Sequence, residues 1–546
     1  MDFHVDRSRD SLTSRNRLPR CVSALCLLIP AAVLTIFFAL PVATLVTRFT
    51  NLGVVRSVWR DPVVRRVVWF TTWQAVLSTV LTVAVGMVPA YVLARFEFVG
   101  RRLVGALIVV PFVMPTVVVG AAFLALLPDS FDNSVAAIII AHVFFNVAVI
   151  VRGVGGLWEQ IPSDLGAAAR TLGAPPWQVA RHITLPLLAP AIAASASVVF
   201  LFTFTSFGVV RLLGGPAHPT LEVEIWQRAT RLGDVGVAAV LSAVQLLVLA
   251  LAIAWFARLQ KRHRAQLGLR PLTQRTRARG RRDRAVVGTT ALTVLLFVIG
   301  PLGALFEGSL RAGTSYSLAA WRTLFSPDSS AKRGPASSLD VVGSMITSLR
   351  FALIAMAIAV VVGTAACVAI VTMQRSGRIL DAALMLPLAT SAVTIGFGLL
   401  ITFDTDPFDW RGAPLMIPLG HAVVATPFVV RILLPVLRSI DPDLRHAAMS
   451  LGASPMRVLR EIDWPVVRRP VLSAAGFALV ISLGEFGATS FLTRSGRETM
   501  PIAIDRLLAQ PGALLHAQGY VLATMLALMT FLVIAAVDGL RAGRNA

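Results

Sequence analysis

One stretch of sequence occurs twice and decides the fold. The first copy reads Asp164-Leu-Gly-Ala-Ala-Ala-Arg-Thr-Leu-Gly173-Ala-Pro-Pro-Trp-Gln-Val-Ala-Arg-His-Ile183-Thr-Leu-Pro186, and the second reads Asp443-Leu-Arg-His-Ala-Ala-Met-Ser-Leu-Gly452-Ala-Ser-Pro-Met-Arg-Val-Leu-Arg-Glu-Ile462-Asp-Trp-Pro465. In each copy a pair of alanines precedes a glycine that can adopt the left-handed geometry ending a short helix. Small side chains also let another surface approach closely. We therefore expect a helix–glycine–helix elbow in each copy.

Other residues of the stretch fit the same elbow. Asp164 and Asp443 are acceptable N-caps for the first short helix. Pro176 and Pro455 suit the first turn of the second helix. A further proline in each copy marks a turn into the next apolar segment: Pro186 and Pro465.

The two copies belong to a repeat that covers most of the chain. Chance similarity between apolar segments does not align glycines and prolines in this way. The matching residues that are separated by 279 positions are His142 and His421, Arg152 and Arg431, Gly173 and Gly452, Pro186 and Pro465, Phe207-Gly208 and Phe486-Gly487, and Thr220 and Thr499. Two earlier places, Pro111 with Pro387 and Gly120 with Gly396, are displaced by 276. The chain therefore contains two homologous halves in parallel order.

The composition places the chain in a membrane. Of its 546 residues 56% are hydrophobic and only 14% are charged, against about 25% in soluble proteins. Apolar runs of about 20 residues recur, each long enough to cross a bilayer core as a helix. We expect an all-α integral membrane protein with about twelve spans, six in each half: 21–47, 69–94, 103–127, 135–156, 187–212, 235–257, 285–306, 345–372, 379–402, 414–437, 469–492 and 517–540.

Arginine placement indicates the orientation. The N-terminal segment 1–20 and the linker 258–284 are rich in arginine, which is typical of the cytoplasmic side. An even number of spans then places both termini in the cytoplasm. Loops assigned to the outside carry acidic clusters at 129–132 and 404–409, although the first outer loop has five arginines between 48 and 66. Topology thus explains the net charge of +22, and we expect no nucleic acid partner.

A pathway is expected at the interface between the two homologous halves, near a pseudo-two-fold axis along the membrane normal.

These patterns divide the chain into four parts. The parts are a cytoplasmic segment 1–20, a first half 21–257 with its loop at about 160–186, a basic cytoplasmic linker 258–284, and a second half 285–546 with its loop at about 439–465.

The repeated loop resembles the EAA loop of permeases of binding-protein-dependent ABC importers, whose fold is the type I importer fold. The residues that fit are Ala168, Ala169, Gly173, Ile183, Leu185 and Pro186 in the first copy, and Ala447, Ala448, Gly452, Ile462 and Pro465 in the second. The resemblance implies that the loops dock on two cytoplasmic ABC ATPase subunits and that an extracytoplasmic binding protein delivers the substrate. The glutamate that names the motif is absent, since Ala167 and His446 take its place. Asp164 or Asp443 could substitute from one turn earlier.

The resemblance extends over nearly the whole chain and is closest to the fused thiamine-type permeases, followed by the ferric-iron permeases. The stretches that carry it are Ala141–Asn146, Thr220–Gln227 and Ser482–Gly487. It implies a small solute as substrate, with thiamine or a derivative favoured and ferric iron as the alternative. It also implies a non-catalytic subunit of the cytoplasmic membrane, with ATP hydrolysis on separate subunits and no cofactor.

Two pairs of polar residues lie within the apolar runs. Glu485 has Ser206 as its counterpart in the first half, and an ionisable group at membrane depth is a functional candidate. These two residues could line a translocation path that favours a cation, or Glu485 could pack between helices. His142 and His421 form a second pair, but no carboxylate or Cys accompanies them in the sequence, so we expect no metal site.

Two other classes of membrane protein compete with the importer. A proton-driven secondary transporter can have twelve spans, and 95–102 has the basic end of one of its motifs but lacks the Gly and Asp-Arg. A membrane enzyme would need clustered His, Asp or Glu, a phosphate-binding loop or a nucleophile elbow, and we find none of these in the sequence. We therefore expect no catalytic residues.

Overall fold

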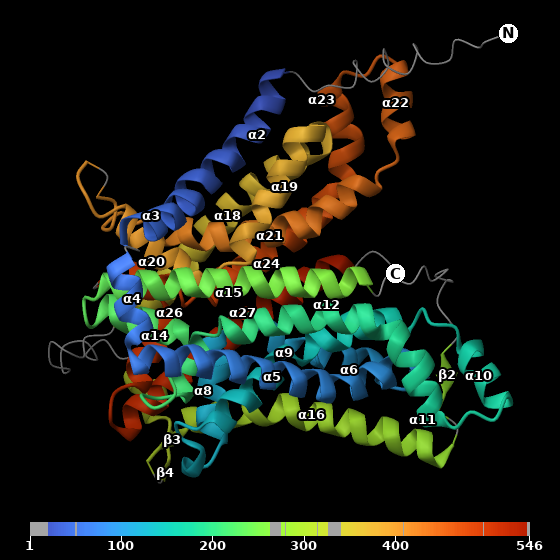
Figure 1. The fold of residues 1–546 in the computed structure, drawn as a ribbon, viewed down its shortest axis with the longest axis horizontal. Coiled ribbons are helices and arrows are strands. Elements are labelled where there is room, and N and C mark those ends of the chain that lie inside the picture. Colours follow the sequence, from blue (N-terminus) through green and yellow to red (C-terminus); the bar gives the residue numbers. More distant parts are fainter. Residues whose placement is uncertain are drawn as a thin grey trace. The chain divides into compact units, whose positions relative to one another are not determined.

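The computed structural model describes residues 20–49, 52–262, 275–278, 280–313, 315–325, 340–407, 409–494 and 496–542, and they are almost entirely helical (Figure 1). The expectations for 1–19 and for 263–274 lie outside the described residues. Residues 20–49 form α2 (Arg20–Leu34), the π-helical turn η1 (Thr35–Ala39) and α3 (Leu40–Phe49). The short strands are β1 (Phe96–Glu97), parallel to β2 (Thr276–Arg277), and β3 (Arg311–Ala312), antiparallel to β4 (Ser315–Tyr316).

The repeat seen in the sequence reappears as matched helices. The matched elements are α5 (Pro62–Arg95) and α18 (Val341–Thr372), α8 (Thr116–Leu126) and α20 (Ala392–Thr402), α9 (Val135–Trp158) and α21 (Met416–Ser439), α10 (Ser163–Thr171) and α22 (Pro442–Ser450), α11 (Pro176–Val179) and α23 (Pro455–Val458), η3 (Ala180–Thr184) and η5 (Leu459–Asp463), α12 (Leu185–Phe204) and α24 (Trp464–Leu483), α13 (Gly208–Leu213) and α25 (Thr489–Leu492), α14 (Leu221–Thr230) and α26 (Met500–Leu508), and α15 (Val235–Arg262) and α27 (Ala513–Ala542). In addition, α6 (Arg101–Leu107) and α7 (Val110–Val113) take the place of α19 (Gln374–Leu388). The remaining elements are α4 (Leu52–Arg60), the 3-10 turn η2 (Asp129–Phe131), α16 (Arg281–Ser309) and α17 (Ala319–Phe325).

The spans agree with the predicted number when bent pairs are counted. Within the described residues, ten helices are long and apolar enough to cross a membrane, or up to twelve if each of two bent pairs is one span. The bent pairs are 101–113 with 116–126, at 104°, and 375–388 with 392–402, at 99°. They correspond to the predicted spans 103–127 and 379–402. The first bend lies at Met114-Pro115, because a proline disfavours helical geometry at the residue that precedes it.

The predicted spans 187–212 and 469–492 are not continuous helices. The helix ends at Phe204 in α12 and at Leu483 in α24, and short helices follow. Matched glycines bring these short helices against the preceding bent pair. A Cβ at Gly208 would lie 2.5 Å from Thr116 Oγ1, and a Cβ at Gly487 would lie 3.1 Å from Val393 Cγ2. Close packing of α13 on α8 and of α25 on α20 therefore accompanies each break.

The compact units are not built from contiguous sequence halves. The first unit contains 1–48, 342–500 and 528–546, and the second contains 49–341 and 501–527. In the first unit, Phe37 of η1 packs on Phe403, with ring centroids 6.0 Å apart. In the second unit, Val294 of α16 lies in a buried cluster with Val147 of α9. The first helix of each sequence half thus packs with helices of the other half.

Each half contains one close helix pair with a glycine on its inner face. In α5, a Cβ at Gly86 would lie 2.7 Å from Ile150 Cβ of α9. In α18, a Cβ at Gly363 would lie 2.6 Å from Val429 Cγ1 of α21. Ile150 and Val429 occupy matched places, 279 positions apart. A small residue on the second helix of each half therefore sets the distance to the helix that leads into the elbow.

We predict that Gly86→Leu destabilises the protein by about 1–3 kcal/mol, because the new side chain overpacks the contact between α5 and α9. Thermal unfolding of the purified protein in detergent measures this change. Gly288→Leu in α16 is the control, since a Cβ there meets nothing within 4 Å. Equal unfolding midpoints for the two variants would contradict the close packing at Gly86.

Candidate functional site

Both elbows have the predicted glycine geometry. Gly173 follows α10 with φ of 85°, and Gly452 follows α22 with φ of 84°. In the first elbow the Ala174 amide donates to the Ala169 carbonyl and the Gly173 amide donates to the Arg170 carbonyl, both at 3.0 Å. The second elbow repeats this pair of hydrogen bonds, which is the Schellman ending of a helix. A Cβ at either glycine would meet nothing within 4 Å, so backbone conformation rather than space requires glycine there.

Two local expectations for the elbows need correction. Asp164 and Asp443 lie in the first helical turn, while the N-caps are Pro162 and Asp441. The Asp441 carboxylate accepts a hydrogen bond from the Asp443 amide at 2.9 Å, so it does the capping in the second elbow. Asp164 and Asp443 still face the positive end of their helix dipole, which stabilises a carboxylate.

The second correction concerns Pro186 and Pro465, which do not form a turn. Each lies in the first turn of a long helix, α12 or α24, directly after a π-helical turn. Pro176 and Pro455 begin the short α11 and α23, as predicted. A proline inside a helix clashes with the carbonyl four residues earlier, and the wider π turn accommodates it. The second arm of each elbow is therefore continuous with a membrane helix, which makes it a rigid lever.

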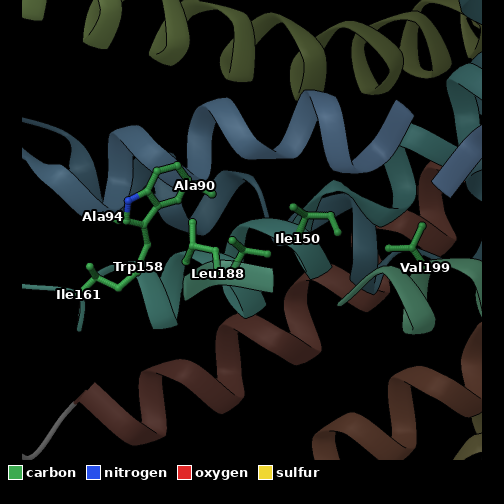
Figure 2. Close-up of a cluster of buried hydrophobic side chains, with 8 residues drawn as sticks. Ala90, Ala94, Ile150, Trp158, Ile161, Leu188 and Val199 are labelled. Carbon is green, nitrogen blue, oxygen red and sulfur yellow. The ribbon is translucent and has the colours of Figure 1, made fainter. Parts of the chain in front are cut away.

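The first elbow leaves and re-enters the membrane domain through one packed cluster. Trp158 at the end of α9, Ile161 and Leu188 in α12 are buried together with Ala90 and other residues of α5 (Figure 2). Both ends of the elbow are thus fixed to the same core. A displacement of the elbow must move α9 and α12 with it.

In the second elbow the residues matched to Trp158, Ile161 and Leu188 are Leu437, Ile440 and Val467, which are also buried, and a polar brace is added. Arg445 of α22 pairs with Asp463 of η5 at 2.8 Å, and both side chains are mostly shielded from solvent. The matched residues of the first elbow are Gly166 and Thr184, which cannot form an ion pair. There α10 comes close to α11, since a Cβ at Gly166 would lie 3.5 Å from Val179. The two elbows therefore share a backbone geometry but differ in this ion pair.

Each elbow exposes apolar side chains at the same four positions. The most exposed are Leu172 and Leu451, each 89% exposed, directly before the glycines. The other exposed pairs are Leu165 and Leu444, Trp177 and Met456, and Leu185 and Trp464. Apart from Leu185, the sequence did not single out these residues, although a leucine directly before each glycine is a repeated signal.

The residues predicted to couple to an ATPase lie on the same surface or just beneath it. Those exposed are Ala168, Gly173, Pro186, Ala447, Gly452 and Pro465. Those half-buried are Ala169, Ile183, Ala448 and Ile462. The two alanine pairs therefore each present one methyl group outward.

The predicted path residues lie at the helix breaks and are buried. Ser206 lies between α12 and α13, and Glu485 lies between α24 and α25. The Glu485 carboxylate accepts hydrogen bonds from the amides of Ala488 at 2.9 Å and Thr489 at 3.0 Å. It also accepts one from Thr489 Oγ1 at 2.8 Å. Glu485 thus satisfies free amides where the backbone is not helical, which a chain at membrane depth requires.

The structure also brings Glu485 against a histidine, which the sequence did not indicate. His421 Nε2 lies 3.3 Å from Glu485 Oε2, and His421 Nδ1 lies 2.7 Å from Ser482 Oγ. In the first half, His142 Nδ1 lies 3.2 Å from Ser78 Oγ, and its Nε2 has no hydrogen-bond partner. The sequence showed no carboxylate near the histidines, and tertiary packing places Glu485 beside His421. The described residues contain no group of three or more His, Cys, Asp or Glu that could hold a metal ion.

Comparison with known proteins decides the class. Residues 82–265 and 371–542 match the family described as binding-protein-dependent transport system inner membrane component. These two matches cover more than half of the chain, and each contains one elbow. The chain belongs to this family. The permease is thus an inner-membrane, multi-pass transport subunit with two permease domains in one chain, as the sequence predicted.

Several relatives match over most of their length. The permease is 30% identical over 465 residues to the thiamine transport system permease protein ThiP of Brucella suis, covering 81% of this chain and 82% of the relative. It is 27% identical over 521 residues to ThiP of Escherichia coli, covering 90% and 91%. A probable ABC transporter permease protein of Sinorhizobium fredii is 25% identical over 532 residues, covering 90% and 92%.

We predict that Glu485→Leu destabilises the permease by about 2–3 kcal/mol, because two amides and a hydroxyl lose their acceptor. Thermal unfolding in detergent measures the loss. Glu485→Gln, which keeps one acceptor oxygen, should lose less stability, and Ser206→Ala at the matched position serves as a control. Unchanged stability with lost transport would instead favour a role of Glu485 in the path.

Proposed function

We propose that this permease forms the path by which thiamine or a thiamine derivative enters the cell, driven by ATP hydrolysis on separate subunits. The relatives named as thiamine transport system permeases support this substrate, since they match over most of both chains. An extracytoplasmic binding protein delivers the solute, which the family description supports. Ferric iron is the alternative substrate.

Paired elbows support the proposal of two ATPase subunits. The observation that carries it is the presence, in both halves, of a left-handed glycine next to a leucine that is 89% exposed. Such exposed apolar side chains on a surface loop are typical of a protein interface. Two ATPase subunits would each cover one elbow. With the glutamate absent, Asp164 and Asp443 are acidic groups at matched positions of these surfaces, both exposed in the first turn.

The orientation with both termini in the cytoplasm gains support from the linker. Strand β2 of the linker pairs with β1, and Arg275 beside it lies 3.1 Å from Glu159 and 3.6 Å from Glu97. Glu159 ends α9 and directly precedes the first elbow. The basic linker and the first elbow therefore lie on one side of the membrane. We assign that side to the cytoplasm because the linker is arginine-rich.

The mechanism we propose is alternating access. Closure of the ATPase subunits on ATP displaces both elbows. In the first half the displacement passes into α9 and α12 through the buried cluster of Trp158, Ile161 and Leu188. In the second half it passes into α24 through η5 and the Arg445–Asp463 pair. The helix breaks beyond α12 and α24 then move relative to the path.

Uptake of radiolabelled thiamine tests the substrate. The permease is expressed with its ATPase and binding protein in cells that lack their own thiamine uptake. We expect uptake that requires the ATPase and that excess unlabelled thiamine abolishes. Uptake of ferric iron but not thiamine would overturn the substrate, and thiamine uptake driven by a proton gradient without the ATPase would overturn the mechanism.

A paired substitution tests the elbows. We predict that Leu172→Asp together with Leu451→Asp lowers thiamine uptake at least about tenfold, because a charge replaces the most exposed apolar contact of each interface. Co-purification of the ATPase measures docking directly and should fall in parallel. Leu232→Asp is the matched control, since Leu232 is 67% exposed and lies outside both elbows. Full uptake and normal ATPase binding in the double variant would contradict docking at the elbows.

A further inference from the structure

Short helices follow the helix break in each half and identify a region for substrate contact. They are α13 and α14 in the first half and α25 and α26 in the second. Even α14, with 10 residues, spans only about 15 Å, half of a bilayer core. Short, interrupted segments at corresponding positions of two repeats indicate where a transporter binds its substrate. Groups on these helices that can recognise a solute are therefore candidates for substrate contact.

Two matched positions on α14 and α26 meet at one arginine. Trp226 and Asp505 are 279 positions apart and hold the same place in the repeat. The guanidinium carbon of Arg211, in α13, lies 4.6 Å from the centre of the Trp226 ring. Arg211 Nε lies 3.2 Å from Asp505 Oδ1. All three residues belong to the same compact unit.

The three side chains make a site shaped for a flat cation. A guanidinium is planar and delocalised, and here it contacts an aromatic ring and a carboxylate at once. The Arg211 and Asp505 side chains are only 14% and 13% exposed. The pair is not a full bidentate fork, because Arg211 donates one hydrogen bond of 3.4 Å from Nη2 and its Nε–H has no hydrogen-bond partner. Trp226 Nε1 is buried and also has no hydrogen-bond partner.

We propose that Trp226 and Asp505 form a binding site for a planar organic cation and that Arg211 occupies this site until the substrate displaces it. The proposal rests on the proposed thiamine function, since thiamine carries a flat thiazolium cation. The ring would stack on Trp226 while Asp505 balances the charge, and Arg211 would move aside.

The Asp505 carboxylate favours a cation over an anion against the Trp226 ring. A monovalent cation that takes the place of Arg211 keeps one positive charge between this ring and the carboxylate. Arg231, whose guanidinium carbon lies 4.9 Å from the Trp226 ring centre, and Arg506, next to Asp505 in sequence, then face the same charge as before. An anion would instead have to compete with Asp505 for Arg211 and would face the carboxylate itself.

The obvious alternative is a purely structural ion pair, and three variants separate the two. If Arg211 and Asp505 only hold helices together, Arg211→Gln and Asp505→Asn both weaken cation binding. The double variant then recovers binding, because no unpaired charge remains. If Arg211 occupies a binding site, the single variants have opposite effects on cation binding. Removing Arg211 frees the site, whereas removing Asp505 abolishes it.

The experiment measures binding to the full-length permease purified with its ATPase subunits in detergent. The probes are thiamine and the 1-methylnicotinamide cation, and binding is measured as the rise in unfolding temperature with probe concentration. We expect Arg211→Gln to tighten the apparent Kd about tenfold, and Asp505→Asn, Trp226→Leu and the double variant to weaken it at least about tenfold. Trp226→Phe, which keeps an aromatic face, should weaken it less than Trp226→Leu.

The outcomes distinguish this inference from the proposed function. Weaker cation binding in Arg211→Gln, with recovery in the double variant, would contradict the proposed site. Cation binding that is unchanged in Asp505→Asn and Trp226→Leu would also contradict it. If wild-type cells fail to take up thiamine but 1-methylnicotinamide binding depends on Asp505 and Trp226 as described, the thiamine function fails and the cation site stands. If cells take up thiamine but none of the variants changes binding, the function stands and the cation site fails.

Discussion

A helix that ends inside a bilayer leaves amide and carbonyl groups without water, and the permease depends on how these groups find partners. At the break after α24, the Glu485 carboxylate takes two backbone amides and the Thr489 hydroxyl. His421 lies against this carboxylate and is itself held by Ser482. A fully bonded polar cluster of this kind fixes one geometry of the bend, because each lost partner would leave a buried group unsatisfied. The break can then persist where a continuous helix would otherwise form.

The two halves have the same backbone arrangement but carry different polar side chains at matched positions. Glu485 has Ser206 as its counterpart, Asp505 has Trp226, and the Arg445–Asp463 brace has a glycine and a threonine. A related pair even exchanges its charges. Arg101 of α6 pairs with Glu159 at the end of α9, whereas Asp381 of α19 pairs with Arg438 near the end of α21. The repeated frame thus carries mechanical parts that both halves need, while the polar residues have diverged.

The structure of the elbows depends both on local sequence and on tertiary packing. A left-handed glycine ends each short helix and turns the chain, and this depends on a few neighbouring residues. The packing that makes this turn a lever involves residues distant in sequence. Ala90 of α5 completes the buried cluster that holds Trp158 and Leu188 at the two ends of the first elbow. Without that packing the elbow would be a surface loop with no connection to the path.

The sequence by itself determined the membrane class, the repeat, the elbow glycines and the family resemblance. Each of these follows from composition, from residue spacing or from the φ that only glycine adopts easily, and none needs a distant contact. Tertiary structure alone decided that α12 and α24 end early, that α16 packs with the first-half helices, that Glu485 meets His421, and that Trp226 and Asp505 meet at Arg211. The reason is that periodicity and hydropathy describe a helix and its environment, but not which helix lies beside it. Partners 64 or 294 residues apart come together only when the helices pack.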